Sequence, residues 1–426
     1  MSCDLVRVPL SSLGKIVTGK TPPSKVTDAF VNGSVPFVTP RDLDDRKWIK
    51  TTERYLSNTG LESVKGNIVP AFSVAVSCIG SDMGKARLLP VKSVTNQQIN
   101  TILVNSELHN PEYIYYVLST KQQSLKDIAG GSATPILNKS HFGQFEIDLP
   151  SKGYQDAVVD VLRGLDSKIE INTQTNQTLE QIAQAIFKSW FVDFDPVKAK
   201  MNGEQPEGMD AATASLFPEK LVESELGLIP EGFAVNQLSD ICKNHSQSYN
   251  LKSVDEVVFV NTGDVLEGDF LHKDYSPVVG LPGQAKKAIK EDDILYSEIR
   301  PKNKRFAYVD FDVSDYVVST KFMVIQANEK VHPRLLYMIL TRQSTIDEFN
   351  IIADSRSGTF PQITFKAISN LKFCMAPREI QDAFVAQVMP MIKLQRSLKS
   401  ENKQLAELRD TLLPKLLSGE IELEVK

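Results

Sequence analysis

The feature of this 426-residue chain that most limits its fold is an internal duplication. The tripeptide Gln-Asp-Ala at residues 155–157 recurs at residues 381–383, a shift of 226 residues that also carries Pro135 onto Pro361. With a few residues of drift, the segment 110–115 falls on the segment 332–337. A chain of this length is too long for one typical core. We therefore predict two similar domains, each followed by a long helix.

The segments after both domains carry apolar and amide residues that alternate by four and three positions over several heptads, which is the pattern of a coiled-coil seam. The predicted seam residues are Leu162, Leu165, Ile169, Asn176 and Leu179 in the first helix, and Val388, Leu398, Asn402, Leu405 and Leu412 in the second. Either helix alone would expose its stripe, so we expect the two to pair antiparallel, with Asn176 and Asn402 near the middle. Two amphipathic helices that each pack on their own domain remain the alternative.

The acidity of the chain is concentrated between the halves. The net charge is −5, yet residues 193–231 alone contribute −6, so the remainder carries +1. This segment also contains four prolines, and we predict an acidic linker. Since net charge informs about partners only through its distribution, the overall sign does not exclude nucleic acid.

The predicted fold class is α/β (α+β): two similar mixed domains separated by an antiparallel coiled coil of two long helices, with an internal pseudo-two-fold repeat. The predicted boundaries are 1–150 for the first domain, 151–192 for the first helix, 193–231 for the linker, 232–376 for the second domain and 377–426 for the second helix.

The sequence Gly14–Thr21 matches the phosphate-loop pattern GxxxxGK[ST]. A working phosphate loop follows a buried strand and opens a helix, whose N-terminal amides bind the phosphates. Here Pro22 and Pro23 follow at once, the residues before are interrupted by polar side chains, and the second half keeps none of the motif. We therefore predict a turn rich in Gly, Thr and Pro, and keep a nucleotide-binding enzyme as an alternative.

Other catalytic patterns are weak. The five histidines show no HxxxH or HExxH spacing and no GxSxG motif is present, so we expect no metal site, no cofactor and no catalytic residue. The carboxylates Asp292, Asp293 and Glu298 faintly resemble a nuclease cluster, but an arginine stands where a lysine is usual. The four cysteines are far apart, and neither a signal peptide nor a membrane span is visible, so we expect reduced thiols in a cytoplasmic protein.

Cation-rich loops recur at matching places in the two halves, at residues 80–87 and 299–305, and again at 130–139 and 355–366. Small hydroxyl residues, amides, arginine and lysine are what proteins use to bind phosphates and base edges. We predict DNA contacts at Lys85, Arg87, Thr134, Lys139, Arg300, Lys302, Lys304, Arg305, Arg356 and Lys366.

Together these features resemble the specificity subunit of type I restriction-modification systems. The resemblance covers the whole chain and is most specific at residues 183–196, at residues 412–421, and at the turn Thr18–Pro22. The second half lacks this turn, so we expect its early loop to be built differently.

The resemblance implies two target-recognition domains that read an asymmetric, bipartite site in double-stranded DNA, held apart by the paired helices. It also implies that methylation, ATP hydrolysis and cleavage belong to partner subunits. Methyltransferase subunits, two in number, are expected to dock on the helices and conserved segments, with restriction subunits joining through them. The candidate docking residues are Phe187, Trp190, Phe191, Phe194, Leu416 and Leu417.

Two alternatives stay open. The aromatic cluster of the first helix could instead cap the coiled coil on the neighbouring domain. The duplicated domains could also form a non-catalytic tether that binds only protein, in which case DNA would be irrelevant.

Overall fold

The computed structural model describes residues 5–129, 136–356 and 361–423. The chain divides into two compact units, residues 1–175 together with 397–426, and residues 176–396. The boundary cuts both long helices, so each unit combines one domain with part of α5 (Lys152–Lys188) and part of α12 (Arg378–Ser418).

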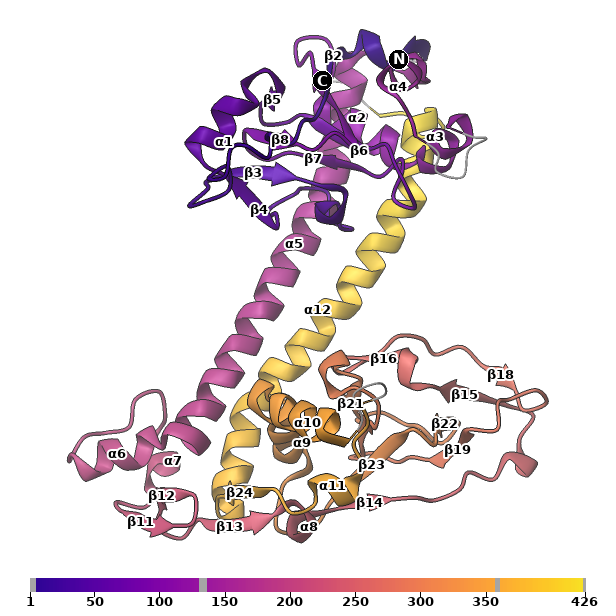
Figure 1. The fold of residues 1–426 in the computed structure, drawn as a ribbon. Coiled ribbons are helices and arrows are strands. Elements are labelled where there is room, and N and C mark those ends of the chain that lie inside the picture. The colour runs from indigo at the N-terminus through magenta and orange to yellow at the C-terminus, as the bar shows by residue number, and fades with distance from the viewer. Residues whose placement is uncertain (1–4, 130–135, 357–360, 424–426) are drawn as a thin grey trace. The chain divides into compact units, whose positions relative to one another are not determined.

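The first unit contains two four-stranded sheets (Figure 1). One sheet has the order β2-β9-β6-β7, formed by Gly14–Thr18, Ile99–Val104, Val74–Ser77 and Ala86–Leu88. The other has the order β4-β3-β8-β5, formed by Arg54–Leu56, Val35–Val38, Ser93–Thr95 and Ile68–Val69. Within the second sheet β3 and β8 are parallel. The main helices of this domain are α1 (Asn58–Ser63), α2 (Pro111–Ser119), α3 (Gln122–Ile128) and α4 (Lys139–Gln144).

The second unit repeats both sheets with the same strand order. One is β14-β23-β20-β21, formed by Cys242–His245, Phe322–Ala327, Ile294–Ser297 and Phe306–Tyr308. The other is β18-β15-β22-β19, formed by Ser276–Pro277, Glu256–Val260, Tyr316–Ser319 and Ala285–Ala288, with β15 and β22 parallel. The main helices of the second domain are α8 (Leu238–Ile241), α9 (Pro333–Thr341), α10 (Gln343–Arg356) and α11 (Phe365–Ile368). The predicted duplication and mixed α/β class are confirmed.

Each domain is closed by an antiparallel pair that joins its first strand to the strand before its long helix. These pairs are β1 (Val6–Pro9) with β10 (Glu146–Leu149), and β13 (Ala234–Gln237) with β24 (Lys372–Met375).

The repeated Gln-Asp-Ala tripeptide has the same structural role in both units. Gln155 is 1% exposed, accepts a hydrogen bond from the backbone N–H of Asn110 at 2.9 Å and donates to the carbonyl of Pro150 at 2.9 Å. Gln381 is 0% exposed, accepts from the N–H of His332 at 2.8 Å and donates to the carbonyls of Ala376 and Lys330. Asn110 and His332 are the N-caps of α2 and α9. A buried glutamine therefore ties each long helix to the start of a domain helix.

The long helices pair antiparallel within each unit. In the first unit Asn172 donates to Asn402 at 2.9 Å, and Tyr154 donates to the carbonyl of Leu416 at 3.2 Å, so residue numbers fall along α5 as they rise along α12. In the second unit the rings of Phe187 and Phe384 lie 6.0 Å apart. The ten predicted seam residues are all buried or half-buried.

The segment 193–231, which we expected to be a linker, is folded into the second unit. One π-helical turn η4 (Ser189–Asp193) leads into α6 (Asp195–Met201), α7 (Ala211–Ser215) and the hairpin β11–β12 (Leu221–Ser224, Gly227–Pro230). Val197, Phe217 and Ile229 are buried in the main core of that unit. Most acidic residues of the segment are exposed, and its net charge gave no sign of these few buried apolar residues.

Among the described residues, the structure contains no helix that is both long enough and apolar enough to span a membrane.

Candidate nucleic-acid interface

The two cation-rich loops of the second unit lie side by side. The loop between β20 and β21 meets the segment before α11 through a bridge between Ile299 and Gln362. Arg300 donates its backbone N–H to the carbonyl of Pro361 at 3.0 Å, and Ile363 donates to the carbonyl of Glu298 at 2.8 Å. Two loops that are about 60 residues apart in sequence therefore form one surface.

The first unit brings its own two loops together in the same way. The loop between β6 and β7 meets the segment before α4 through a bridge between Ile79 and Ile136. Leu137 donates its N–H to the carbonyl of Cys78 at 3.0 Å. Gly80 and Gly84 adopt positive φ angles of 69° and 81°, which explains the glycines of this hairpin. The repeat thus reproduces the surface although the residues on it differ.

The predicted DNA-contacting residues fall into four groups. Lys139, Arg300, Lys302 and Lys366 are exposed. Lys85 and Lys304 are paired with Asp82 and Glu267, each at 2.9 Å. Thr134 and the side chain of Arg356 lie outside the described residues.

The remaining two, Arg87 and Arg305, point into the protein. Arg87 is 9% exposed and its guanidinium donates to the backbone carbonyls of Asp44 and Ala86. Arg305 is half-buried and donates to the carbonyls of Gly263 and Val265. Both groups hold a neighbouring loop.

Sequence reasoning missed those neighbouring loops. Each follows the parallel strand of the second sheet and begins with a short 3-10 turn, η2 (Pro40–Asp42) or η6 (Thr262–Asp264). The exposed Arg41 and Arg46 lie in the first of them. The reciprocal capping pattern at the start of each turn, Thr-x-x-Asp and Asn-x-x-Asp, was the signal that could have revealed them.

The phosphate-loop pattern does not form a phosphate loop. Its first residues, Gly14–Thr18, are strand β2, paired along its length with β9. The backbone N–H groups of Gly19 and Lys20 continue this pairing by donating to the carbonyls of Ile99 and Thr95, and no helix begins between Thr18 and Pro40, a stretch that the structure describes throughout. The expectation of a Gly- and Thr-rich turn is therefore wrong for the motif's first half, which is a strand.

The segment after β2 instead lies where the two sheets of the first unit approach each other. A Cβ at Gly19 would lie 2.1 Å from the carbonyl oxygen of Asn96, so this glycine allows the close approach of the two sheets. In the second unit the matching segment instead runs beside β19, where Ala288 donates to the carbonyl of Gln247 and Tyr249 to that of Lys286. The early loop of the second half is therefore built differently, as expected.

Two of the three carboxylates that resembled a nuclease cluster, Asp292 and Asp293, have structural roles. Asp293 is 1% exposed and accepts hydrogen bonds from Gln326 and from the N–H of Lys290, each at 2.9 Å, while Asp292 accepts from the Tyr308 hydroxyl. Burial raises the pKa of Asp293. Among the described residues no group of three or more His, Cys, Asp or Glu side chains could hold a metal ion.

Three cysteines lie in the described part of the chain and are free thiols. Burial raises the pKa of Cys78 and of Cys374 to about 11 and that of Cys242 to about 12. These three thiols are therefore protonated at neutral pH and are not activated nucleophiles.

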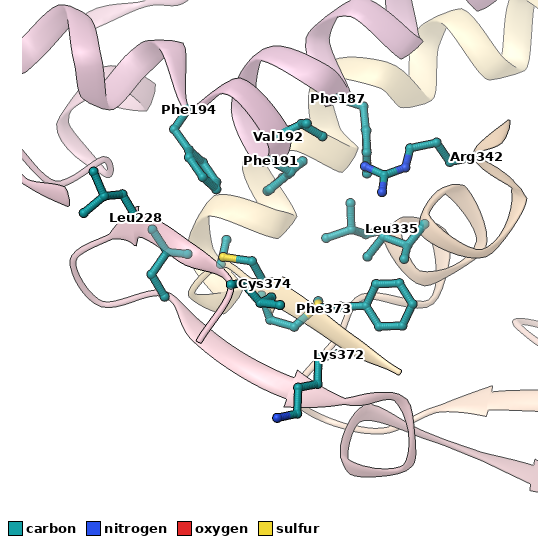
Figure 2. A pocket seen from close by; sticks show the side chains of 15 residues that line it. Phe187, Phe191, Val192, Phe194, Leu228, Leu335, Arg342, Lys372, Phe373 and Cys374 are labelled. Carbon is teal, nitrogen blue, oxygen red and sulfur yellow. The ribbon is translucent and has the colours of Figure 1, made fainter. Parts of the chain in front are cut away.

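The aromatic residues at the end of α5 divide between the core and a cavity. Phe187 and Trp190 are 6% and 4% exposed and pack on Phe384 and Phe217 in the second unit. Figure 2 shows the adjoining cavity, whose volume is about 310 Å³ and whose lining combines aromatic and aliphatic side chains with two basic ones. Among its lining residues are Phe187, Phe191, Val192, Phe194, Leu226, Leu228, Arg342, Lys372 and Cys374. Trp190 therefore acts as a core residue, whereas Phe191 and Phe194 line a recess.

The C-terminal candidates belong to the first unit. Leu416 is 1% exposed inside its core, and Leu417 packs half-buried against the same core. Tyr154 fixes this end of the chain by donating to the carbonyls of Leu416 and Ile421 at 3.2 and 2.7 Å. The side chain of Leu416 is therefore buried in the core of the first unit and is not part of the surface.

Comparison with known proteins agrees with this architecture. The family model of the type I restriction modification DNA specificity domain matches residues 4–181 and 230–408, one copy in each half. The MjaIX specificity subunit of Methanocaldococcus jannaschii is 27% identical over 97% of this chain and 93% of its own length. The HindI specificity subunit of Haemophilus influenzae is 47% identical over 40% of this chain, and the match spans 38% of that subunit.

A solved structure shows the same fold. The type I restriction-modification S subunit of M. genitalium superimposes with a TM-score of 0.59 over 97% of this chain and 96% of that one, at 15% sequence identity. The repeated domains, the paired helices and the two matched copies of the family model lead to one conclusion: this chain belongs to the type I restriction modification DNA specificity domain family.

Proposed function

We propose that this chain is the DNA sequence-specificity subunit of a type I restriction-modification complex. It reads an asymmetric, bipartite site in double-stranded DNA with its two domains and leaves methylation and cleavage to partner subunits. One observation carries the proposal. Both units place the same two loops side by side at the same point of the same strand order, yet the residues on the two surfaces differ. Two surfaces of one design and different chemistry suit two different half-sites.

The paired helices give the proposal a physical basis for spacing. A helix of 37 residues, as in α5, is about 56 Å long at 1.5 Å per residue. One turn of duplex spans about 34–36 Å, so a helix of this length matches a spacing between half-sites of about one turn or more. We propose that α5 and α12 set this distance.

Salt-dependent DNA binding tests the assignment of the loops. Lys302→Glu and Lys366→Glu should weaken specific binding of the assembled complex and lower its dependence on salt, because each lost phosphate contact reduces the slope by about one. Lys330→Glu makes the same charge change at an exposed residue outside both loops and serves as the control. Unchanged affinity in both loop variants would contradict the proposal and favour a protein-binding tether.

We further propose that modification subunits, two in number, dock on the long helices and conserved segments, and that the cavity beside α5 is one contact. Leu228 is 58% exposed at this cavity, and Leu226 is 46% exposed. Exposed leucines beside a recess that contains Phe191 and Phe194 suit an apolar partner segment. Restriction subunits would join through the modification subunits.

Leu228→Asp tests this contact without altering the buried core. The variant should lose co-purification with a modification subunit, because a carboxylate would be transferred from water into an apolar interface. Leu271→Asp, at a residue 54% exposed and outside the cavity lining, is the matched control. Equal assembly of both variants would exclude the cavity as a contact.

The nucleotide-binding alternative is tested in the isolated chain. Because Gly14–Thr18 is a paired strand, we expect no ATP turnover. Turnover that Lys20→Ala abolishes would overturn this assignment.

A further inference from the structure

Each unit uses an arginine of its cation-rich hairpin to hold a different loop. In both cases the guanidinium donates to backbone carbonyls of the loop that follows the parallel strand of the second sheet. Guanidinium–carbonyl bonds are charge-assisted, and the planar donor fork fixes direction as well as distance. The same arrangement occurs twice although the two loops share little sequence.

In the first unit the loop is held from two sides. Arg87 of β7 donates to the carbonyl of Asp44, and its Nη2 lies 3.8 Å from the carboxylate of Asp45. On the other side the ammonium of Lys47 lies 2.7 Å from Glu112 and 2.6 Å from the hydroxyl of Tyr116, and its side chain is 9% exposed. Residues 44–47 are therefore anchored through both their backbone and a buried lysine.

In the second unit the hairpin holds the loop through both a side chain and the backbone. Nη1 of Arg305 lies 3.0 Å from the carbonyl of Gly263 and 2.9 Å from that of Val265. The backbone adds two bonds, from Glu267 to Lys304 and from Gly268 to Phe306, each at 2.9 Å. The turn at the start of this loop is closed by Asp264, which accepts from the N–H of Asn261 at 2.8 Å.

We propose that Arg87 and Arg305 are positioning residues for DNA reading. They fix the loops 40–46 and 262–267, and these loops, rather than the two arginines, lie on the DNA-contacting surface. The inference rests on the proposed function and extends it, because it adds one loop to the reading surface of each domain and removes two of the predicted contacts.

The second unit offers a clean test, because residues 261–268 contain no lysine or arginine. Arg305→Met keeps the apolar stem and removes the donors. We expect specific affinity of the complex with modification subunits to fall roughly tenfold, about 1.4 kcal/mol, with an unchanged salt slope. Lys302→Met, at a proposed phosphate contact, should lower the slope by about one.

Arg305→Gln supplies the second variant. Its neutral amide can still donate to a carbonyl, so a positioning role predicts that it recovers part of the affinity lost in Arg305→Met. A direct phosphate contact predicts loss in both variants together with a lower slope. Hydrogen exchange of the amides of residues 263–267 should accelerate in Arg305→Met, in the free protein as well as in the complex.

The loop that Arg87 holds carries Arg41, an exposed cation. Because moving this loop would also move a cation, the salt slope does not separate the two roles of Arg87, and a double-mutant cycle is used instead. If Arg87 acts through the loop, Arg87→Met should cost much less in an Arg41→Ala background than in the wild type. Additive effects would mean that the two arginines act independently.

The duplex used is the one whose site has been mapped by methylation sequencing. Wild-type complex that fails to bind it specifically would overturn the proposed function. If the wild-type complex binds specifically, three results would overturn only this inference. They are a lowered salt slope in Arg305→Met, an unchanged affinity in Arg305→Met, and additive effects of Arg87→Met and Arg41→Ala on the binding free energy.

Discussion

The two units share their frame and differ in their buried charges. Both tie a long helix to a domain helix with a glutamine that bonds only backbone groups. At the second residue of that domain helix, however, the first unit has Glu112 and the second has Arg334, 6% and 5% exposed. Contacts to the backbone survive divergence of side chains, whereas each buried charge is matched to partners of its own unit.

Those partners are opposite in sign. Glu112 lies 2.7 Å from both Lys47 and Arg163. Arg334 lies 2.5 Å from Asp310 and 3.6 Å from the centre of the Tyr308 ring. If the charged residue of one unit were placed at the matching position of the other, it would therefore be buried without an oppositely charged partner.

The largest effect should come from placing the second unit's charge in the first. Glu112→Arg would bury a cation beside Lys47 and Arg163, and we expect the first unit to lose about 3–5 kcal/mol of stability or more. Chemical denaturation monitored by hydrogen exchange in each unit is the measurement. Glu107→Arg, at an exposed position, is the control. A loss below about 1 kcal/mol would show that the two networks are interchangeable.

The shared glutamines should give the next largest effect. Gln381→Ala removes three buried hydrogen bonds and Gln155→Ala two, so we expect losses of about 2–4 kcal/mol, larger at Gln381. The exposed residues Gln343 and Gln123, on α10 and α3, provide matched alanine controls. Equal melting temperatures of the buried and exposed variants would contradict the shared role.

A smaller effect is expected for the pH dependence of the stability of the first unit, to which Glu112 contributes. Burial of Glu112 acts to raise its pKa, but the bonds from Arg163 and Lys47 outweigh this, and the pKa is lowered. Its contribution to stability is therefore complete above the ordinary glutamate pKa of about 4.3 and is lost as pH falls through the lowered value. Urea unfolding of the first unit should be less acid-sensitive in Glu112→Gln than in the wild type. Parallel pH profiles would contradict this.

The two seam asparagines should give the smallest effect. Asn402 is bonded to Asn172 at 2.9 Å, whereas Oδ1 of Asn176 is buried without a hydrogen-bond partner among the described residues. Asn402→Leu should cost about 1 kcal/mol because it removes the hydrogen bond from Asn172, which then keeps only its bond to Glu401, while Asn176→Leu should be neutral or stabilising. Thermal unfolding of both variants checks the order, and a larger loss at Asn176 would reverse it.

Repetition and periodicity in the sequence predicted the fold well, because the same strands and caps had to form twice. The tripeptide at 155–157 marked the buried anchor, and the heptads marked the paired helices. The segment 193–231 was misjudged because a few residues such as Val197 and Phe217 decide its packing, while its many acidic residues dominate its composition.

The candidate site was predictable only as a set of loops. Which cations face outward depends on hydrogen bonds between distant residues, as between Arg305 and Gly263. Composition counts Arg87 and Lys302 alike, although one is buried and the other exposed. The turns at Pro40 and Thr262 escaped notice because short capped turns carry little signal in a single sequence.

Mapping of methylated bases by sequencing, in cells that carry the complete system, tests the central claim most directly. We predict one asymmetric motif with two specified parts separated by unspecified bases. Replacing the loop at residues 299–305, which belongs to the second unit, by the matching residues 80–87 of the first unit should change one part of the motif and leave the other intact. A single continuous or palindromic motif, or simultaneous change of both parts, would contradict the account.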